Sequence, residues 1–240
     1  MNTRLYVALL LFCPFVVFGQ GRSRLPYTQN ELEAIASHFK LREMSGAEAN
    51  ATGFLEQVEQ QQLIHLATHA EVDAENPLNS ELLFSEKEGQ NTSVKVNELY
   101  NLDLQSELAV LSACNTGVGM QAKGIGNMSI AHAFAVAGCP SIVLTEWQVD
   151  DAATSEVMKV FYRELADEKP IHEALRQAKL EYLATSQKVR AAPYYWAGVN
   201  AWGNTTALQY KDQRPWGYYL PGGILIGLLF FIGYRVVSRS

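Results

Sequence analysis

Cysteine is scarce in this chain of 240 residues, and the three that occur are Cys13, Cys114 and Cys139. Cys13 lies in an N-terminal apolar run, so only two cysteines remain for a globular domain. Two are too few for a disulfide framework, and no spacing of cysteine and histidine fits a structural zinc site. The stability of the folded part must therefore come from a packed hydrophobic core.

Charge is also sparse, because Asp, Glu, Lys and Arg together make up 18% of the chain. The formal net charge is −6 and no basic block offsets it, which argues against nucleic acid as a partner. Low-complexity tracts are absent and 48% of the residues are hydrophobic, so the sequence is not that of a globally disordered chain. Its length fits one domain with extensions.

A long uncharged stretch, residues 216–234, lies near the C-terminus. At about 1.5 Å per residue, a helix of this length just crosses a bilayer core of about 30 Å. Aromatic residues lie at both edges of the stretch, where membrane proteins place them. We therefore expect a single-pass membrane protein with a linker at 206–215, a transmembrane helix at 216–234 and a short basic tail at 235–240. A buried core helix is the competing interpretation. Basic residues on both flanks leave open which side of the membrane the domain faces.

The N-terminal residues 1–20 allow two interpretations. Arg4 precedes an apolar run, Leu5–Phe18, and Gly19 supplies a small residue before Gln20, which is the pattern of a cleaved signal peptide. The same run is also typical of a buried strand followed by a loop. Both interpretations stay open at this point.

Between these ends, the period of the apolar residues changes repeatedly. Helical spacing predicts helices over 31–39, about 47–60, 96–102, 128–137, 152–166 and 171–186. Short apolar runs predict strands over 63–68, 82–84, 108–113, 141–145 and 194–199. The alternation of buried strands and helices indicates an α/β sandwich with a largely parallel sheet, in which chemistry gathers at the carboxyl ends of the strands.

His69 and Cys114 each follow a predicted buried strand. Cysteine attacks carbonyl groups as a thiolate, so it needs a neighbour that takes its proton, and histidine is the usual one. The same histidine can later protonate the leaving amine. On spacing alone, however, the pattern favours an ordinary core cysteine and a hydrogen-bonded core histidine.

The residues around this pair resemble a known family. The segments His65–Ala70 (HLATHA) and Leu111–Gly117 (LSACNTG) resemble the two signature blocks of CHAT-domain proteases, caspase-like clan CD cysteine proteases related to caspases and separase. The similarity covers roughly residues 25–203 in the same order and spacing. It continues through Gly124–Gly126, Ala131–Gly138, Trp147–Asp151 and Tyr194–Ala197. Together these blocks are specific, although each alone is weak.

The resemblance implies a caspase-like three-layer α/β sandwich over residues 25–205. It also implies that His69 is the catalytic base and Cys114 the nucleophile, with backbone N–H groups of Ala70 and Cys114 as the oxyanion hole. Such donors stabilise a tetrahedral intermediate by a few kcal/mol. Many members of the family have glycine where this chain has Ala70. No metal and no cofactor are implied.

Four other residues have a structural and a functional interpretation. His65, within a predicted strand, is interpreted as structural, and Cys139, before a proline, as a core thiol. Asp150 and Asp151 follow the strand at 141–145, close to the expected cleft. They are candidates for a pocket that binds a basic substrate side chain, and helix capping is the competing interpretation.

The resemblance therefore implies a membrane-anchored cysteine endopeptidase that cleaves proteins or peptides through a thioester. The alternative is an inactive CHAT-like interaction or scaffold module at the membrane, with a regulatory protein partner. The domain usually begins with additional strands, so the chain resembles a shortened copy in which part of residues 1–20 is a remnant strand. That shortening favours the inactive alternative.

Overall fold

A six-stranded sheet forms the centre of the computed structural model, which describes residues 15–18, 28–73, 75–85, 92–112, 125–147 and 149–208. Its order is β2-β1-β3-β7-β8-β9, and every neighbouring pair is parallel except β8 and β9. The strands are β1 (Phe15–Phe18), β2 (Arg42–Ser45), β3 (Leu63–Leu66), β7 (Leu108–Leu111), β8 (Ser141–Thr145) and β9 (Val199–Gly203). The prediction of an α/β fold with a mostly parallel sheet is confirmed.

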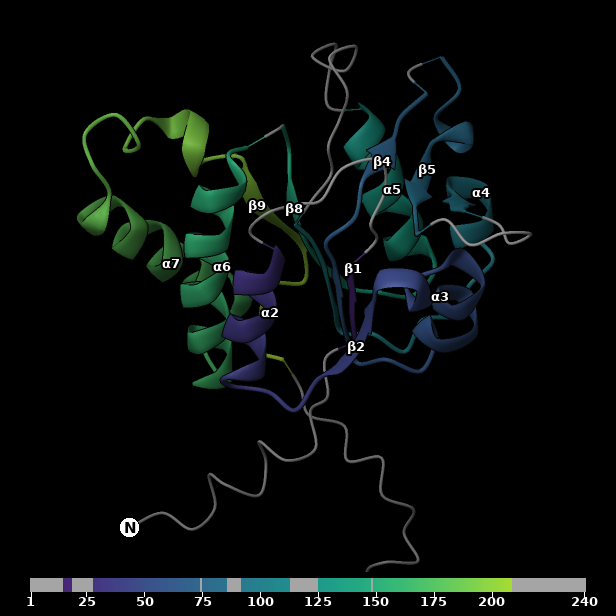
Figure 1. Ribbon diagram of the computed structural model, residues 1–240, viewed down its shortest axis with the longest axis horizontal. Coiled ribbons are helices and arrows are strands. Elements are labelled where there is room, and N and C mark those ends of the chain that lie inside the picture. Colours follow the sequence, from purple (N-terminus) through teal and green to yellow (C-terminus); the bar gives the residue numbers. More distant parts are fainter. Residues whose placement is uncertain are drawn as a thin grey trace, which may run out of the picture. The chain divides into compact units, whose positions relative to one another are not determined.

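Helices cover both faces of this sheet (Figure 1). One face carries α2 (Thr28–Ala36), α6 (Asp151–Ala166) and α7 (Ile171–Thr185). The other carries α3 (Ala51–Val58), α4 (Val96–Leu99), α5 (Ile125–Val136) and a small antiparallel sheet of β4 (Ala70–Glu71), β5 (Glu81–Leu83) and β6 (Ser93–Lys95). Because both faces are covered, the inner strands β3, β7 and β8 are buried along their whole length.

The alternation of side chains along each strand divides the core in two. In β3, Ile64 and Leu66 point into the cluster under α3 and α5, whereas Leu63 belongs to the cluster under α2 and α6. The first cluster includes a close ring pair of Phe54 and Phe84, with centroids 5.0 Å apart. His65 shares the α2 and α6 face with Leu63, where polar groups must find partners inside the protein.

Three sequence-based predictions differ from the structure. The strand expected at 82–84 is β5, which belongs to the small antiparallel sheet and not to the parallel one. The strand expected at 194–199 was wrong for most of its length, because Pro193–Tyr195 forms a short 3₁₀ helix and β9 begins only at Val199. Pro193 lies in the first turn of this helix, where its missing N–H costs nothing. The helix expected at 47–60 begins with a 3₁₀ helix, Gly46–Glu48, before α3.

The two apolar ends of the chain are described only in part. Phe15–Phe18 forms β1, and the rest of residues 1–20 lies outside the described residues. No helix within the described part of the chain is both long and apolar enough to cross a bilayer. The predicted transmembrane helix at 216–234 and the basic tail at 235–240 lie outside that part.

Candidate active site

The strands that precede His69 and Cys114 are neighbours in the sheet. β3 pairs with β7 in parallel, with Leu66 opposite Leu111, and the N–H of Ser112 donates to the Leu66 carbonyl at 3.1 Å. His69 comes three residues after Leu66, and Cys114 comes three residues after Leu111. The described strands therefore run side by side to the same edge of the sheet. Cys114 itself lies outside the described residues, within the gap at 113–124.

His69 lies between the end of β3 and the beginning of β4. Its side chain is buried, and its carbonyl accepts a hydrogen bond from the N–H of Leu83 at 2.8 Å. The hydroxyl group of the neighbouring Thr68 donates to the carbonyl of Leu83. The backbone around His69 is thus fixed on the strand β5, which holds the histidine at the edge of the large sheet.

Ala70 follows in β4, opposite Leu82. His69 precedes Ala70, and its carbonyl accepts the hydrogen bond from the Leu83 N–H. Ala70 and Leu82 are therefore a non-hydrogen-bonded pair of the antiparallel ladder. The N–H of Ala70 therefore points away from β5 and is not used in that pairing. The methyl group of Ala70 is buried in the hydrophobic core. Compared with a glycine at this position, alanine therefore adds a methyl group to the core.

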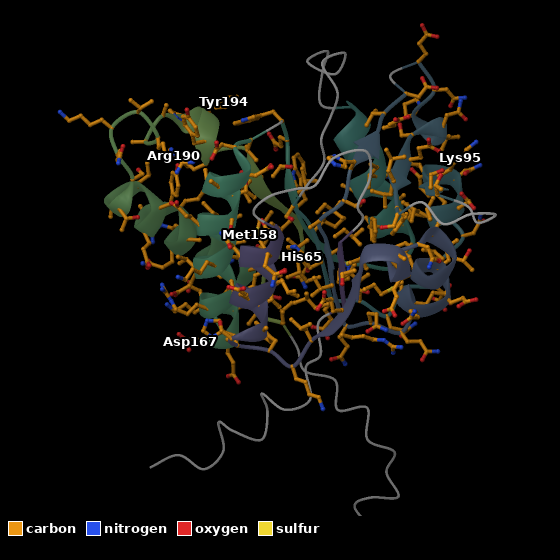
Figure 2. All side chains as sticks on the ribbon, in the orientation of Figure 1. His65, Lys95, Met158, Asp167, Arg190 and Tyr194 are labelled. Atoms are coloured by element: carbon orange, nitrogen blue, oxygen red, sulfur yellow. The ribbon has the colours of Figure 1, made fainter. Side chains whose placement is uncertain are left out.

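Asp150 is engaged by two partners. Its Oδ1 accepts from the N–H of Ala153 at 2.9 Å, which caps the N-terminus of α6, and from Arg190 Nη2 at 2.6 Å. Figure 2 shows Arg190 and Tyr194 at the same end of the helical layer, opposite to Asp167. The helix-capping interpretation thus describes what Asp150 does in this structure, and the residue also holds the segment that contains Arg190.

Asp151, the first residue of α6, is exposed. Partial desolvation raises the pKa of its carboxyl group, the nearby charges of Glu31 and Asp150 raise this pKa further, and His69 lowers it. The electrostatic effect of His69 on Asp151 indicates that the two residues lie in the same neighbourhood. The structure therefore brings together three of the residues named from the sequence, His69, Asp150 and Asp151.

Two blocks of the sequence resemblance pack against each other beside Asp150. The indole N–H of Trp147 donates to the carbonyl of Tyr194 at 3.0 Å. A Cβ atom on Gly198 would lie 2.8 Å from the Trp147 ring, so only glycine allows this approach. Trp147, just after β8, is therefore in direct contact with the segment Tyr194–Gly198.

A buried polar cluster, which sequence reasoning missed, lies between α2, β3, β7 and α6. His65 Nε2 is 3.1 Å from Glu31 Oε2, and His65 Nδ1 is 2.7 Å from the Tyr162 hydroxyl group. The Ser112 hydroxyl group donates to Glu31 Oε2 at 2.9 Å. Burial first, and then the charge of Glu31, raise the pKa of Tyr162 well above its usual range. The signal in the sequence was Glu31 itself, four residues before Ile35 on the face that α2 buries.

Cys139 lacks the exposure and the low pKa expected of a nucleophilic cysteine. Its thiol is fully buried just before β8, and its Sγ donates to the carbonyl of Ser141 at 3.2 Å. Burial raises the pKa of this thiol to about 12. No group of His, Cys, Asp and Glu among the described residues could hold a metal ion.

Comparisons with known proteins bear on this arrangement. A family model of the CHAT domain matches residues 12–204. Among solved structures, the chain is similar to gingipain R, an Arg-specific cysteine proteinase, with a TM-score of 0.52 and 8% sequence identity. The match covers 84% of this chain and 48% of the gingipain chain, so this chain spans about half the length of that protein. At this identity the likeness shows the fold alone. No curated protein in the comparison matches the chain.

Proposed function

The chain belongs to the CHAT domain family and has a caspase-like fold, and on that premise we propose that it is a cysteine endopeptidase with Cys114 as nucleophile and His69 as base. One observation carries the proposal. β3 and β7 are parallel neighbours in register, and each proposed catalytic residue follows its strand by the same three residues. Residues placed in this way converge at the carboxyl edge of a parallel sheet.

In the proposed reaction, the imidazole of His69 takes the proton of the Cys114 thiol, and the thiolate attacks the carbonyl carbon of the scissile peptide bond. The oxyanion accepts hydrogen bonds from the backbone N–H groups of Ala70 and Cys114. His69 then gives its proton to the leaving amine, and the intermediate collapses to a thioester. Water hydrolyses the thioester, with His69 again acting as base. Every proton in these steps moves between this chain, the substrate and water.

For the substrate, we propose a protein or peptide with a basic residue before the cleaved bond. Asp150 is engaged by Arg190 and by the cap of α6, so the proposed receptor of the basic side chain is Asp151. Asp151 is exposed and lies in the electrostatic neighbourhood of His69. The similar fold of gingipain R, which is named as Arg-specific, is consistent with this preference.

Membrane anchoring is a separate part of the proposal and depends on the uncharged residues 216–234. Deletion of all residues after Arg214 should release the protein from the membrane fraction, because it removes the uncharged stretch proposed to span the bilayer. The full-length chain serves as the control. Membrane association that persists after the deletion would count against this segment as the sole anchor.

The decisive experiment incubates the full-length protein with a peptide library and identifies the cleavage products by mass spectrometry. Cys114→Ala should abolish the cleavage and Cys139→Ala should leave it in place, which makes the second thiol a matched control. Cleavage that survives in Cys114→Ala contradicts the mechanism. A preference for acidic residues before the cut contradicts only the role of Asp151. A folded protein that cleaves nothing and does not react with cysteine-directed peptide probes supports the alternative, an inactive scaffold module at the membrane.

A further inference from the structure

A buried carboxylate on α2 contacts both strands that lead to the proposed catalytic pair. Glu31 Oε2 accepts from the hydroxyl group of Ser112 at 2.9 Å and lies 3.1 Å from His65 Nε2. Ser112 comes directly after β7, two residues before Cys114, and His65 lies in β3, four residues before His69. One oxygen atom thus joins the ends of the two strands, in a place where the side chains are shielded from water.

The partners determine which atoms carry hydrogen in this cluster. A carboxylate can only accept, so His65 presents Nε2–H to Glu31. His65 Nδ1 lies 2.7 Å from the hydroxyl group of the fully buried Tyr162. Ser112 donates to the same carboxylate, and its Oγ lies 3.3 Å from His65 Nε2, so Glu31, His65 and Ser112 are in mutual contact.

Stability alone does not explain such a cluster. Burying a carboxylate costs free energy, and apolar side chains of similar volume often hold a helix on a sheet equally well. Hydrogen bonds to a charged acceptor add direction, because they weaken quickly when donor and acceptor move apart. The bond from the Ser112 N–H to the Leu66 carbonyl fixes the same strand end through the backbone. The cluster thus specifies where the last residues of β3 and β7 lie relative to each other.

We propose that Glu31 is a positioning residue of the proposed active site, because it binds Ser112 and His65 through one oxygen atom and thereby fixes β3 and the end of β7, from which the chain continues to His69 and Cys114. The inference rests on the proposed function and assigns Glu31 no contact with substrate. A cysteine gives its proton to a histidine only within hydrogen-bond reach, and a misplacement of about 1 Å can lower the rate about 100-fold.

The test uses full-length variants of Ser112, whose loss removes one link without leaving a new buried charge. Ser112→Ala should lower kcat about 10-fold to 100-fold at unchanged KM, and it should slow the alkylation of Cys114 by iodoacetamide at neutral pH. Ser112→Thr keeps the hydroxyl group and should restore most of both rates. Ser106→Ala is the matched control: it removes a buried serine hydroxyl group at the other end of β7, which donates to the Gln61 carbonyl at 2.6 Å, so it should lower the melting temperature and leave kcat unchanged.

A second variant tests whether Glu31 and Ser112 act as one link. Glu31→Ala should lower kcat at least as much as Ser112→Ala, and the double variant should lose little more, because the link is already broken. Losses that multiply in the double variant would overturn the inference. If Glu31→Ala does not fold, the comparison of Ser112→Ala with Ser112→Thr decides alone.

The outcomes separate this inference from the proposed function. A wild-type protein that cleaves peptides, with Ser112→Ala equal to it in kcat and in Cys114 alkylation, overturns the positioning role only. A wild-type protein that cleaves nothing, but whose Cys114 alkylation slows in Ser112→Ala and in His69→Ala, counts against the peptidase and supports the positioning. Alkylation that is insensitive to both His69 and Ser112, without any cleavage, overturns both.

Discussion

His65 lies inside β3, and His69 lies three residues beyond the end of that strand. His65 is fully buried, with Glu31 at one ring nitrogen and Tyr162 at the other. His69 is held by its backbone against β5 and lies in the electrostatic neighbourhood of the exposed Asp151. The two histidines are only four residues apart in the sequence. The ring of His65 makes buried contacts inside the fold, whereas His69 lies at the carboxyl edge of the sheet.

The same division applies to the other two pairs of residues that the sequence singled out. Cys139 is buried before β8, at the opposite edge from the end of β7 that leads to Cys114. Asp150 is used as a helix cap and an ion-pair partner, whereas Asp151 is exposed. Each pair thus has one member that serves the fold and one that the proposed chemistry requires, and each comparison can be tested.

The largest expected difference is between the two histidines. His69→Ala should lower peptidase activity on the order of 10⁴-fold, and adding Cys114→Ala should cost little more, because nucleophile and base act as one unit. His65→Gln should lower the activity of folded molecules far less than His69→Ala, by no more than the loss expected for Ser112→Ala, and should lower the free energy of unfolding by about 1–3 kcal/mol. Activity assays together with chemical denaturation measure both quantities. A stable His65→Gln protein without activity would reverse the assignment.

The two cysteines should differ in their reaction with iodoacetamide. At a pKa of about 12, the thiolate fraction of Cys139 near pH 7 is on the order of 10⁻⁵. Cys114 should therefore be alkylated at least about 100 times faster in the folded protein, and His69→Ala should slow only Cys114. Mass spectrometry of the digested protein resolves the two sites. Equal rates that do not depend on His69 would class Cys114 as an ordinary core thiol.

A smaller difference is expected from the loss of the carboxylate at position 150. Asp150→Ala removes the cap of α6 and the ion pair with Arg190, so it should lower the free energy of unfolding by about 1–2 kcal/mol. Arg190→Ala keeps the cap, removes this ion pair and the longer one to Glu156 at 3.7 Å, and should cost less than about 1 kcal/mol. Thermal or denaturant unfolding measures both variants. If Asp150→Ala were neutral in stability, the structural role assigned to this residue would be wrong.

The smallest effect concerns the pH dependence of stability at position 151. The raised pKa of Asp151 means that the folded protein binds this proton more tightly than the unfolded chain. Its favourable contribution is complete below pH 3.8, the ordinary value, and is lost as the pH rises through the folded-state pKa. Asp151→Asn should therefore be more favourable at pH 7 than at pH 3, by less than about 1 kcal/mol because the group is partly solvated. An equal effect of the substitution at both pH values would contradict this account.

The core strands and long helices could be predicted from the sequence, because their apolar period is strong. The strand predicted at 141–145 has the bounds of β8, and the helix predicted at 152–166 differs from α6 by one residue. The short strands β2 and β6 were missed because they carry few apolar residues. The strand predicted at 194–199 failed because its aromatic residues look like a buried strand, whereas Tyr194 is exposed and belongs to the 3₁₀ helix Pro193–Tyr195.

The candidate site was predictable only where residue type and strand position agree. His69, Asp150 and Asp151 were expected near one edge, since the ends of parallel strands meet there, and the charge of His69 does act on Asp151. The partners of Asp150 were not predictable, because Arg190 lies 40 residues away in an irregular segment. Glu31 was not predictable as a partner of Ser112 for the same reason, since 81 residues separate them. The catalytic role of His69 and Cys114 stays a prediction.

The pairing of β1 bears on whether residues 1–19 can be removed as a signal peptide. Phe15–Phe18 is paired on both sides, with β2 and with β3. A signal peptidase that cuts after Gly19 would remove this strand, detach β2 from the described sheet and leave β3 with an open edge. Open apolar edges recruit strands from other molecules, so such a secreted product should aggregate. The cleaved-signal interpretation of residues 1–20 thus predicts a mature protein without β1, and N-terminal sequencing of the protein from cells decides between the two interpretations.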